Sequence, residues 1–377
     1  MSAGAREVTI IAHDVGAIGG MERVLSELIE GLHSLGHEVT VIARTCEVAP
    51  GSVARFRRVR GPARPFLIAY PWFLLVASVM LGRWRRGIVQ ATGGIVLAPV
   101  DVISVHYCHQ VGPANPSRSS AVFAINIALV RVVKRLAERL CFDFNRGATY
   151  VCVSEGVARE VREQYPELTG EVITIHNGVD TELFRPGDQE AQGERLRERL
   201  GISNERLIAA FVGSEWERKG LRAAVTALAS APQWDLLVAG DGDKPAYREL
   251  ARALGVEARV HFMGVRGDVK TVYSAANAFL LPTSYETFSL VTFEAAASGL
   301  PLLATAVSGI SELIEDSHNG FFISRDGGDI AARLNELGAD PALRQRLGEA
   351  ARRSASRFTW ERMVLAHHEL YERLASV

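Results

Sequence analysis

The sequence predicts an α/β protein made of two doubly wound domains with parallel sheets. Short apolar runs alternate with longer runs of helical periodicity along nearly the whole chain, which is the pattern of βαβ units. A length of 377 residues is enough for two domains with a core each. Apolar residues make up 48% and charged residues 23%, as in globular proteins, and the net charge of −1 excludes a generally basic nucleic-acid-binding protein.

The first βαβ unit follows directly from the N-terminal residues. Residues 8–12 form an apolar run, 13–20 a glycine-rich loop, 21–35 an amphipathic helix and 39–43 a second strand. The loop lacks the G-x-G-x-x-G spacing of dinucleotide-binding proteins, which argues against a nicotinamide oxidoreductase. The N-terminus shows no apolar signal-peptide core, so we expect no export by that route.

A basic, apolar region follows. Residues 51–90 contain eight arginines and no acid, and they surround the apolar run 66–81. The run is short for a bilayer span and is interrupted by Pro71, so we do not expect a transmembrane helix. Two interpretations stay open. The run is a buried helix of the first domain, or it is an apolar surface with an arginine collar that contacts anionic lipid. A second basic helix, 121–140, adds to the second interpretation.

The histidines and cysteines of the first half show no metal-site spacing. The strand 101–106 runs into His106 and His109, which lie three residues apart without a zinc-type set around them. Either histidine can also be a packed, hydrogen-bonded side chain. The four cysteines form no C-x-x-C pair, which favours reduced, packed thiols in a cytoplasmic protein.

In the second half, polar residues follow the predicted strands. Arg218 and Lys219 come shortly after the strand 207–212, where an arginine fork and a lysine charge can hold a diphosphate. Asp241 and Asp243 follow the next strand in a D-x-D pattern, which we interpret as a turn rather than a metal site.

The stretch 284–303 has the features of an anion site. A strand at 277–281 leads into a loop with Glu286 and then into an apolar helix, and Glu294 follows eight residues after Glu286. Ligands of open parallel sheets bind beyond the carboxyl ends of the strands, where helix N-termini offer N–H groups to phosphates. We expect the N–H groups of residues 287–290 to serve this purpose.

Several motifs together resemble those of the retaining nucleotide-sugar glycosyltransferases of family 4. They are P-T-S-x-E-T-F-S-L-x-x-x-E-A-x-A-x-G-x-P from Pro282, G-G-x-E-R-V from Gly19, S-x-x-x-R-K-G from Ser214 and V-x-x-I-x-N-G-V-D from Val172. The resemblance covers almost the whole chain; it is strongest over 207–322 and weakest over 44–120. It implies the GT-B fold, in which two Rossmann-like domains face each other across a cleft.

The resemblance also implies residue roles. Glu286 would contact the sugar hydroxyls, and His109, favoured over His106, would lie near the donor sugar. Glu294 would accept hydrogen bonds from the ribose. The diphosphate would be bound by Arg218, Lys219, Gly20, Phe288, Ser289 and Leu290, and the base by the backbone of Gly264, Val265 and Arg266. No cofactor and no metal ion would be needed.

We therefore predict a first domain over 1–186, with the helix 358–377 packed back on it, and a nucleotide-binding domain over 194–357. The expected reaction moves a hexose-like sugar from a nucleoside diphosphate to a hydroxyl with retention of configuration. An envelope glycan or a lipid-linked acceptor is the expected partner, at the inner face of the membrane. Alternatives are a sugar-nucleotide epimerase or a phosphorylase on the same fold, or a non-catalytic sugar-nucleotide-binding protein. The base, the sugar and the acceptor stay unassigned.

Overall fold

The computed structural model describes residues 6–16, 19–111, 121–187 and 190–376, which form two compact units. The first unit is Met1–Gly178 with Trp360–Val377, and the second is Val179–Thr359. The boundary thus lies at Gly178 rather than at residue 186. Segment 179–186 lies with the second unit because its backbone carbonyls accept from Arg352, and because the rings of Phe184 and Tyr273 are 6.0 Å apart.

The first unit contains a seven-stranded parallel sheet with the order β5-β3-β1-β6-β7-β8-β9. Its strands are β1 (Glu7–Ile11), β3 (Glu38–Ala43), β5 (Arg55–Arg58), β6 (Ile88–Thr92), β7 (Val102–Val105), β8 (Thr149–Cys152) and β9 (Val172–Thr174). A separate two-stranded sheet pairs β2 (Asp14–Val15) with β4 (Thr45–Cys46). The central strands are buried on both faces, which explains why their sequences are largely apolar.

Helices cover this sheet, and the last helix of the chain is one of them. They are α1 (Gly20–Ser34), α2 (Phe66–Trp84), α3 (Ala121–Phe144), α4 (Glu155–Gln164) and α14 (Trp360–Leu374). The Tyr371 hydroxyl of α14 donates to Gln90 Oε1 in β6 over 2.6 Å, and Glu372 pairs with Arg6. The C-terminal helix therefore packs on the N-terminal unit through buried and half-buried contacts.

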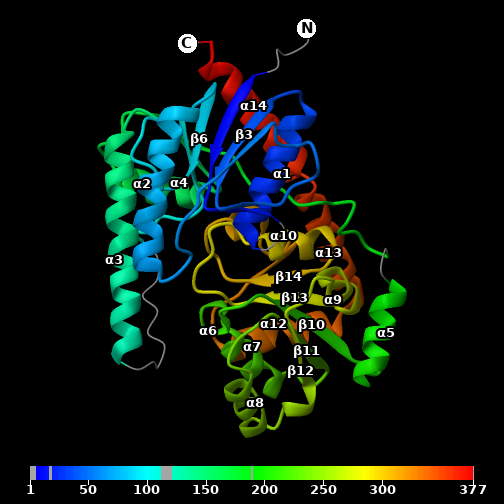
Figure 1. The fold of residues 1–377 in the computed structure, drawn as a ribbon. Helices are drawn as coiled ribbons and strands as arrows, with labels where there is room; N and C mark the ends of the chain where they lie inside the picture. The colour runs from blue at the N-terminus through cyan, green and yellow to red at the C-terminus, as the bar shows by residue number, and fades with distance from the viewer. Residues whose placement is uncertain (1–5, 17–18, 112–120, 188–189, 377) are drawn as a thin grey trace. The chain divides into compact units, whose positions relative to one another are not determined.

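Helix α2 has a feature of each of the two interpretations of the apolar run. One of its faces packs into the unit through Ala69, Phe73, Ala77 and others, while the opposite face stays exposed. By length and composition α2 is long and apolar enough to cross a bilayer, and a third of its most apolar window is buried inside the unit. It lies beside α3 along one flank of the unit (Figure 1).

The second unit contains a six-stranded parallel sheet with the order β12-β11-β10-β13-β14-β15. The strands are β10 (Leu207–Val212), β11 (Trp234–Ala239), β12 (Val260–Gly264), β13 (Ala278–Leu281), β14 (Leu302–Ala304) and β15 (Gly320–Phe322). The helices are α5 (Glu190–Leu200), α6 (Trp216–Lys219), α7 (Leu221–Ala227), α8 (Lys244–Ala253), α9 (Val269–Ala275), α10 (Leu290–Ala297), α11 (Ile310–Leu313), α12 (Gly327–Ala339) and α13 (Pro341–Ala355). This sheet has the doubly wound order 3-2-1-4-5-6, and the first sheet has the same order with a seventh strand added at the end.

The four cysteines are all free thiols, and three of them are buried in the first unit. Cys46 is half-buried. Burial raises the pKa of the Cys141 thiol to about 12. A thiol with such a pKa stays protonated at neutral pH and is a poor nucleophile or metal ligand. The cysteines of the first unit are therefore packing groups.

Candidate functional site

The switch point of the second sheet brings together residues that are distant in sequence. The chain leaves β10 in one direction and β13 in the other, and these two strands are neighbours in the sheet. The segments that follow them must therefore lie side by side beyond the carboxyl edge, which is where open parallel sheets bind ligands. Arg218 and Lys219 follow β10, and Glu286 follows β13.

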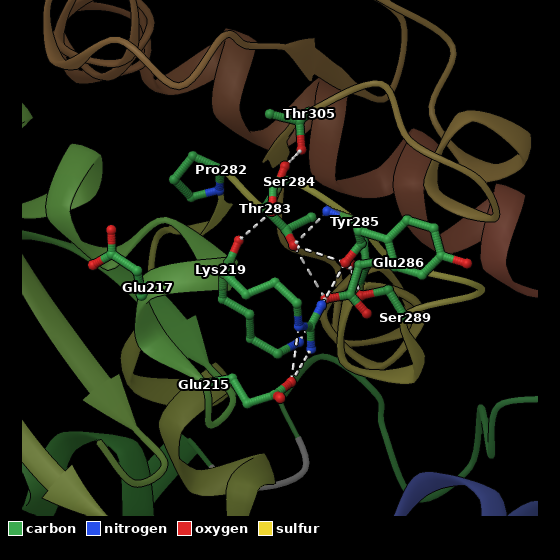
Figure 2. Close-up of polar contacts among 12 residues, drawn as sticks. Glu215, Glu217, Lys219, Pro282, Thr283, Ser284, Tyr285, Glu286, Ser289 and Thr305 are labelled. Carbon is green, nitrogen blue, oxygen red and sulfur yellow. Dashed lines mark hydrogen bonds and ion pairs between the residues drawn. The ribbon is translucent and has the colours of Figure 1, made fainter. Parts of the chain in front are cut away.

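Three donors converge on one oxygen of Glu286 at this point (Figure 2). Lys219 Nζ donates to Glu286 Oε1 over 2.7 Å, and Arg218 donates to the same oxygen over 3.2 Å. The Thr283 hydroxyl lies 3.3 Å from it and also donates. The Lys219 and Glu286 residues are each 9% exposed. The predicted diphosphate clamp and the predicted sugar-contacting carboxylate are therefore ion-paired in the free protein.

The two carboxylate oxygens of Glu286 differ in their hydrogen bonds to the described part of the chain. Among the described residues, no side chain or backbone group donates a hydrogen bond to Oε2. Thr283 is itself held in place, because its carbonyl accepts from the Thr305 hydroxyl over 2.6 Å. Glu286 thus has one fixed oxygen and one that can accept from a ligand hydroxyl.

Arg218 is fixed by two further acceptors. Its Nε donates to Glu215 Oε2 over 2.8 Å, and its guanidinium also donates to the carbonyl of Tyr285. Burial opposes the charged form, but the carboxylates of Glu286 and Glu215 outweigh it and raise the pKa of Arg218. Glu217, by contrast, points away from this group (Figure 2). The charged cluster therefore consists of two carboxylates and two cations, namely Glu215, Glu286, Arg218 and Lys219.

The segment that carries the clamp is a helical turn rather than the predicted loop. Residues 216–219 form α6, with Glu215 before it in the left-handed region at φ 55°. Gly213 ends β10 at φ 140°, and a Cβ there would lie only 2.5 Å from Lys219 Cε. The absence of a side chain at Gly213 therefore makes room for the lysine stem.

Helix α10 begins shortly after Glu286, at the last of the four predicted N–H donors. Its first residue is Leu290, and Ser289 precedes it in the left-handed region at φ 74°. The Ser289 and Thr292 hydroxyls are 2.9 Å apart and buried. The first turn of a helix presents N–H groups that have no partner inside the helix. Phe288, Ser289 and Leu290 thus line the loop and first turn beside the charged cluster.

The two glutamates have different surroundings. Glu294 lies within α10, is 6% exposed and accepts from the Tyr273 hydroxyl over 3.2 Å. Glu286 lies in the loop before the helix, as the sequence indicates. The eight-residue spacing therefore joins one loop carboxylate to one helix carboxylate rather than two on one helical face.

Comparison with known proteins identifies the family. The model described as glycosyl transferases group 1 matches residues 192–354, and the model described as Glycosyltransferase Family 4 matches residues 18–183. The chain belongs to glycosyltransferase family 4. A D-inositol 3-phosphate glycosyltransferase of Corynebacterium aurimucosum is 32% identical over 233 residues, 58% of this chain and 55% of that enzyme. The chain thus spans about half the length of this curated relative.

Solved structures show that the fold is GT-B. Sucrose-phosphate synthase from Thermosynechococcus elongatus has a TM-score of 0.78 at 21% identity and covers 98% of this chain and 99% of its own. Anabaena HepE in complex with UDP-glucose has a TM-score of 0.73 at 20% identity and covers 99% and 100%. At such identities the likeness establishes the fold alone.

The remaining predicted residues of this family 4 protein lie at the same carboxyl edge or in the first unit. Gly264 ends β12 at φ 69°, Val265 is 78% exposed, and Arg266 forms an ion pair with Asp268. Asp243 caps α8 by accepting from Ala246 N over 3.1 Å, which explains half of the D-x-D pattern as helix chemistry. No group of three metal-ligating side chains occurs among the described residues.

Gly20 and His109 belong to the first unit. Gly20 is exposed and opens α1, after Gly19 at φ 98°. His109 follows β7 and is half-buried; burial, and next the charges of Lys134 and Arg135, lower the pKa of His109 to about 4. His109 is therefore a neutral hydrogen-bonding group near pH 7 rather than an acid. His106 shows the same direction, with a pKa lowered to about 4 by burial and by His367.

Glu138 holds the loop that carries His109, a role that was not predicted from the sequence. Both of its carboxylate oxygens accept from His109 N, at 3.1 and 3.0 Å, and the Tyr165 hydroxyl donates to Oε1 over 2.6 Å. Burial raises the pKa of Glu138 to about 6, although these hydrogen bonds lower it. The available signal was a lone acid on the apolar face of a basic helix, at i+4 from Lys134.

We expect the protonation of Glu138 to make stability depend on pH. Its folded pKa of about 6 lies above the ordinary 4.5, so the folded protein holds this proton more tightly than the unfolded chain. That contribution is present below pH 4.5 and is lost as the pH rises to 6, by about 2 kcal/mol. Urea denaturation at both ends of this range should show the unfolding free energy of wild type falling relative to Glu138→Gln. An unchanged difference would contradict the burial of a titrating Glu138, and Glu163→Gln on exposed α4 controls for charge.

Proposed function

We propose that this family 4 protein transfers a hexose-like sugar from a nucleoside diphosphate to a hydroxyl acceptor and retains the anomeric configuration. The observation that carries the proposal is the convergence of Arg218 and Lys219 on Glu286 at the switch point, beside the first turn of α10. Two cations and a helix N-terminus suit a diphosphate, and a carboxylate suits sugar hydroxyls. The UDP-glucose in Anabaena HepE, a protein of the same fold, supports a donor of this class.

The cluster can act by electrostatic stabilisation. The bond between the sugar anomeric carbon and the diphosphate breaks, and a bond to the acceptor oxygen forms on the same face. Arg218, Lys219 and the N–H groups at the start of α10 would stabilise the negative charge that develops on the leaving diphosphate. The acceptor proton would pass to the departing phosphate oxygen. No residue of the chain then has to serve as a covalent nucleophile.

The ion pair between Glu286 and the two cations would be exchanged when the donor binds. Without donor, Glu286 pairs with Lys219 and Arg218, and Glu215 also pairs with Arg218; with donor, the diphosphate would take over the role of Glu286. Oε2, which accepts from no described residue, would accept from the sugar. An exchange of partners of this kind keeps the buried cations paired in both states, which avoids the cost of leaving a buried charge alone.

The nucleoside would lie over the neighbouring strands. Glu294 would accept from the ribose, and the backbone of Gly264, Val265 and Arg266 would contact the base at the end of β12. From the first unit, Gly20 would approach the diphosphate, and the neutral His109 would contact the sugar. The expected reaction needs no metal, and the expected acceptor is an envelope glycan or a lipid-linked hydroxyl in the cytoplasm.

The test is turnover with a panel of nucleotide sugars. We expect one class of donor to release nucleoside diphosphate slowly to water and faster when an acceptor alcohol is present, with an α-linked donor giving an α-linked product by NMR. A sugar phosphate formed only with added phosphate would indicate a phosphorylase, and an isomerised nucleotide sugar an epimerase. Binding without any turnover would indicate a non-catalytic protein.

Replacing Gly213 tests the clamp geometry. A Cβ at Gly213 (φ 140°) would displace the Lys219 stem, whereas Gly255, also at a positive φ (68°), has no atom within 4 Å of an added Cβ. We expect Gly255→Ala to cost about 1 kcal/mol of stability through strain and to leave nucleotide binding unchanged. Gly213→Ala should in addition weaken binding of the nucleoside diphosphate by about tenfold, because one charge-assisted contact is lost. Equal titration curves for both variants would contradict the proposed role of Lys219.

A further inference from the structure

Helix α2 exposes an apolar stripe to the surroundings of the first unit. Ile68, Trp72, Leu75 and Val79 are 57%, 47%, 60% and 76% exposed. They are spaced by four, three and four residues, so they lie along one face of the helix. The opposite face is buried in the unit, which removes the need for a polar face on α2 itself.

Helix α3 exposes a second stripe with the same spacing. Ile125, Leu129, Val132 and Leu136 are 61%, 48%, 60% and 56% exposed, and Leu140 continues the stripe. The face that carries Ala137, Glu138 and Cys141 is buried. The two helices lie side by side (Figure 1), and Lys134 Nζ is 5.2 Å from the centre of the Phe66 ring. Two neighbouring helices that each expose an apolar stripe are unusual on a globular protein, and such exposed apolar area marks an interaction surface.

Basic side chains border the α2 stripe at both ends. Arg64 precedes α2, and Arg83, Arg85 and Arg86 end it. Trp84 lies between two guanidinium groups, with Arg57 4.1 Å and Arg83 5.5 Å from its ring centre. Among the described residues, no carboxylate lies within ion-pair distance of Arg64 or Arg83, whereas Arg85 and Arg86 pair with acids. The border is therefore positive, with charges free to meet an external partner.

We propose that the exposed stripes of α2 and α3 dock on a bilayer that contains anionic phospholipid. Apolar side chains would enter the interface, while arginines and the aromatic ring of Trp84 would lie at the level of the headgroups. The positive charge of the arginine border favours a bilayer over a second copy of the chain as the partner of this surface. A second copy of the chain would bring its own arginines against this border, and like charges would oppose the pairing. A lipid surface offers apolar chains and negative headgroups together.

Co-sedimentation of the full chain with vesicles tests the proposal without any nucleotide, so its result is independent of the proposed donor chemistry. We expect binding to vesicles of phosphatidylglycerol and phosphatidylcholine, at least about tenfold weaker binding to phosphatidylcholine alone, and weakening by salt. The doubly substituted Leu75→Ser and Leu129→Ser protein should bind anionic vesicles at least about tenfold more weakly. Leu183→Ser, at an exposed leucine of the second unit, is the matched control.

Charge variants complete the test. Arg64→Gln with Arg83→Gln should weaken vesicle binding and reduce its dependence on salt, whereas Arg248→Gln with Arg346→Gln, two exposed arginines of the second unit, should do neither. Circular dichroism checks that each variant is folded. The proposal would be overturned if wild type did not bind anionic vesicles, or if the leucine double variant bound them as well as wild type. So would self-association in analytical ultracentrifugation that the leucine variants abolish, because it would assign the surface to a second copy.

Discussion

Glu286→Gln is expected to lower turnover by about 100-fold or more while the affinity for the nucleoside diphosphate changes by no more than about threefold. The amide keeps an acceptor for Lys219, Arg218 and Thr283, but the group that faces the sugar becomes partly a donor and loses its charge. The affinity for the nucleotide survives because the clamp itself is intact. Steady-state kinetics with the preferred donor, and calorimetric titration with its nucleoside diphosphate, measure the two quantities.

A neighbouring carboxylate supplies the control for this prediction. Glu215 also pairs with Arg218, at 2.7 Å, but its side chain is 62% exposed and makes no contact with Glu286. Glu215→Gln should therefore change turnover by less than about fivefold, since a solvent-exposed ion pair contributes little. Equal losses of turnover and affinity in Glu286→Gln would show that this residue maintains the site's structure and does not act on the sugar.

Removal of the clamp cations is expected to have the second-largest effect, and this effect is on nucleotide affinity rather than on turnover. Arg218→Gln and Lys219→Met should each weaken binding of the nucleoside diphosphate by about 10- to 100-fold, the range for a lost hydrogen bond between charged groups. The nucleoside monophosphate should lose much less, because its single phosphate cannot span both cations. The ratio of the two affinities, from titrations of each variant, reports the clamp directly.

Two comparisons make the clamp prediction specific. Arg248→Gln removes an exposed arginine of α8 and should leave both affinities unchanged. Thermal unfolding without ligand should show that Lys219→Met is less stable than wild type, because Glu286 is buried and loses its shortest ion pair. A parallel loss of monophosphate and diphosphate binding in Arg218→Gln would place the cations elsewhere on the ligand or outside the site.

Strand positions were predictable from the sequence because parallel strands are buried on both faces. Residues 207–212 were predicted as a strand and are β10 in full. Since the carboxyl ends of parallel strands share one edge, the loops that carry Arg218 and Glu286 could be placed at that edge from sequence alone. The glycine after β10 and the G-x-P after α10 likewise indicated, from the local sequence alone, where these elements end.

The pairing of Glu286 with Lys219 could not be predicted, because it depends on strand order and rotamers. The two residues are 67 positions apart and meet only because β13 lies next to β10. The left-handed conformation of Ser289 before α10 could not be predicted either, since it has no signature in a sequence that lacks glycine there. The sequence of α2 has no polar face, so it could not show which half of the helix is buried. Only the packing of the unit determines that.

The measurement that tests the central claim most directly is thermal stabilisation of wild type and Glu294→Ala by UDP-, GDP-, ADP- and dTDP-sugars, with and without EDTA. We predict that one nucleotide class raises the unfolding temperature of wild type regardless of EDTA and fails to do so for Glu294→Ala, whose buried carboxylate would contact the ribose. If no nucleotide sugar stabilised folded wild type, the site at the switch point would not be a donor site, and the proposed transfer reaction would be wrong.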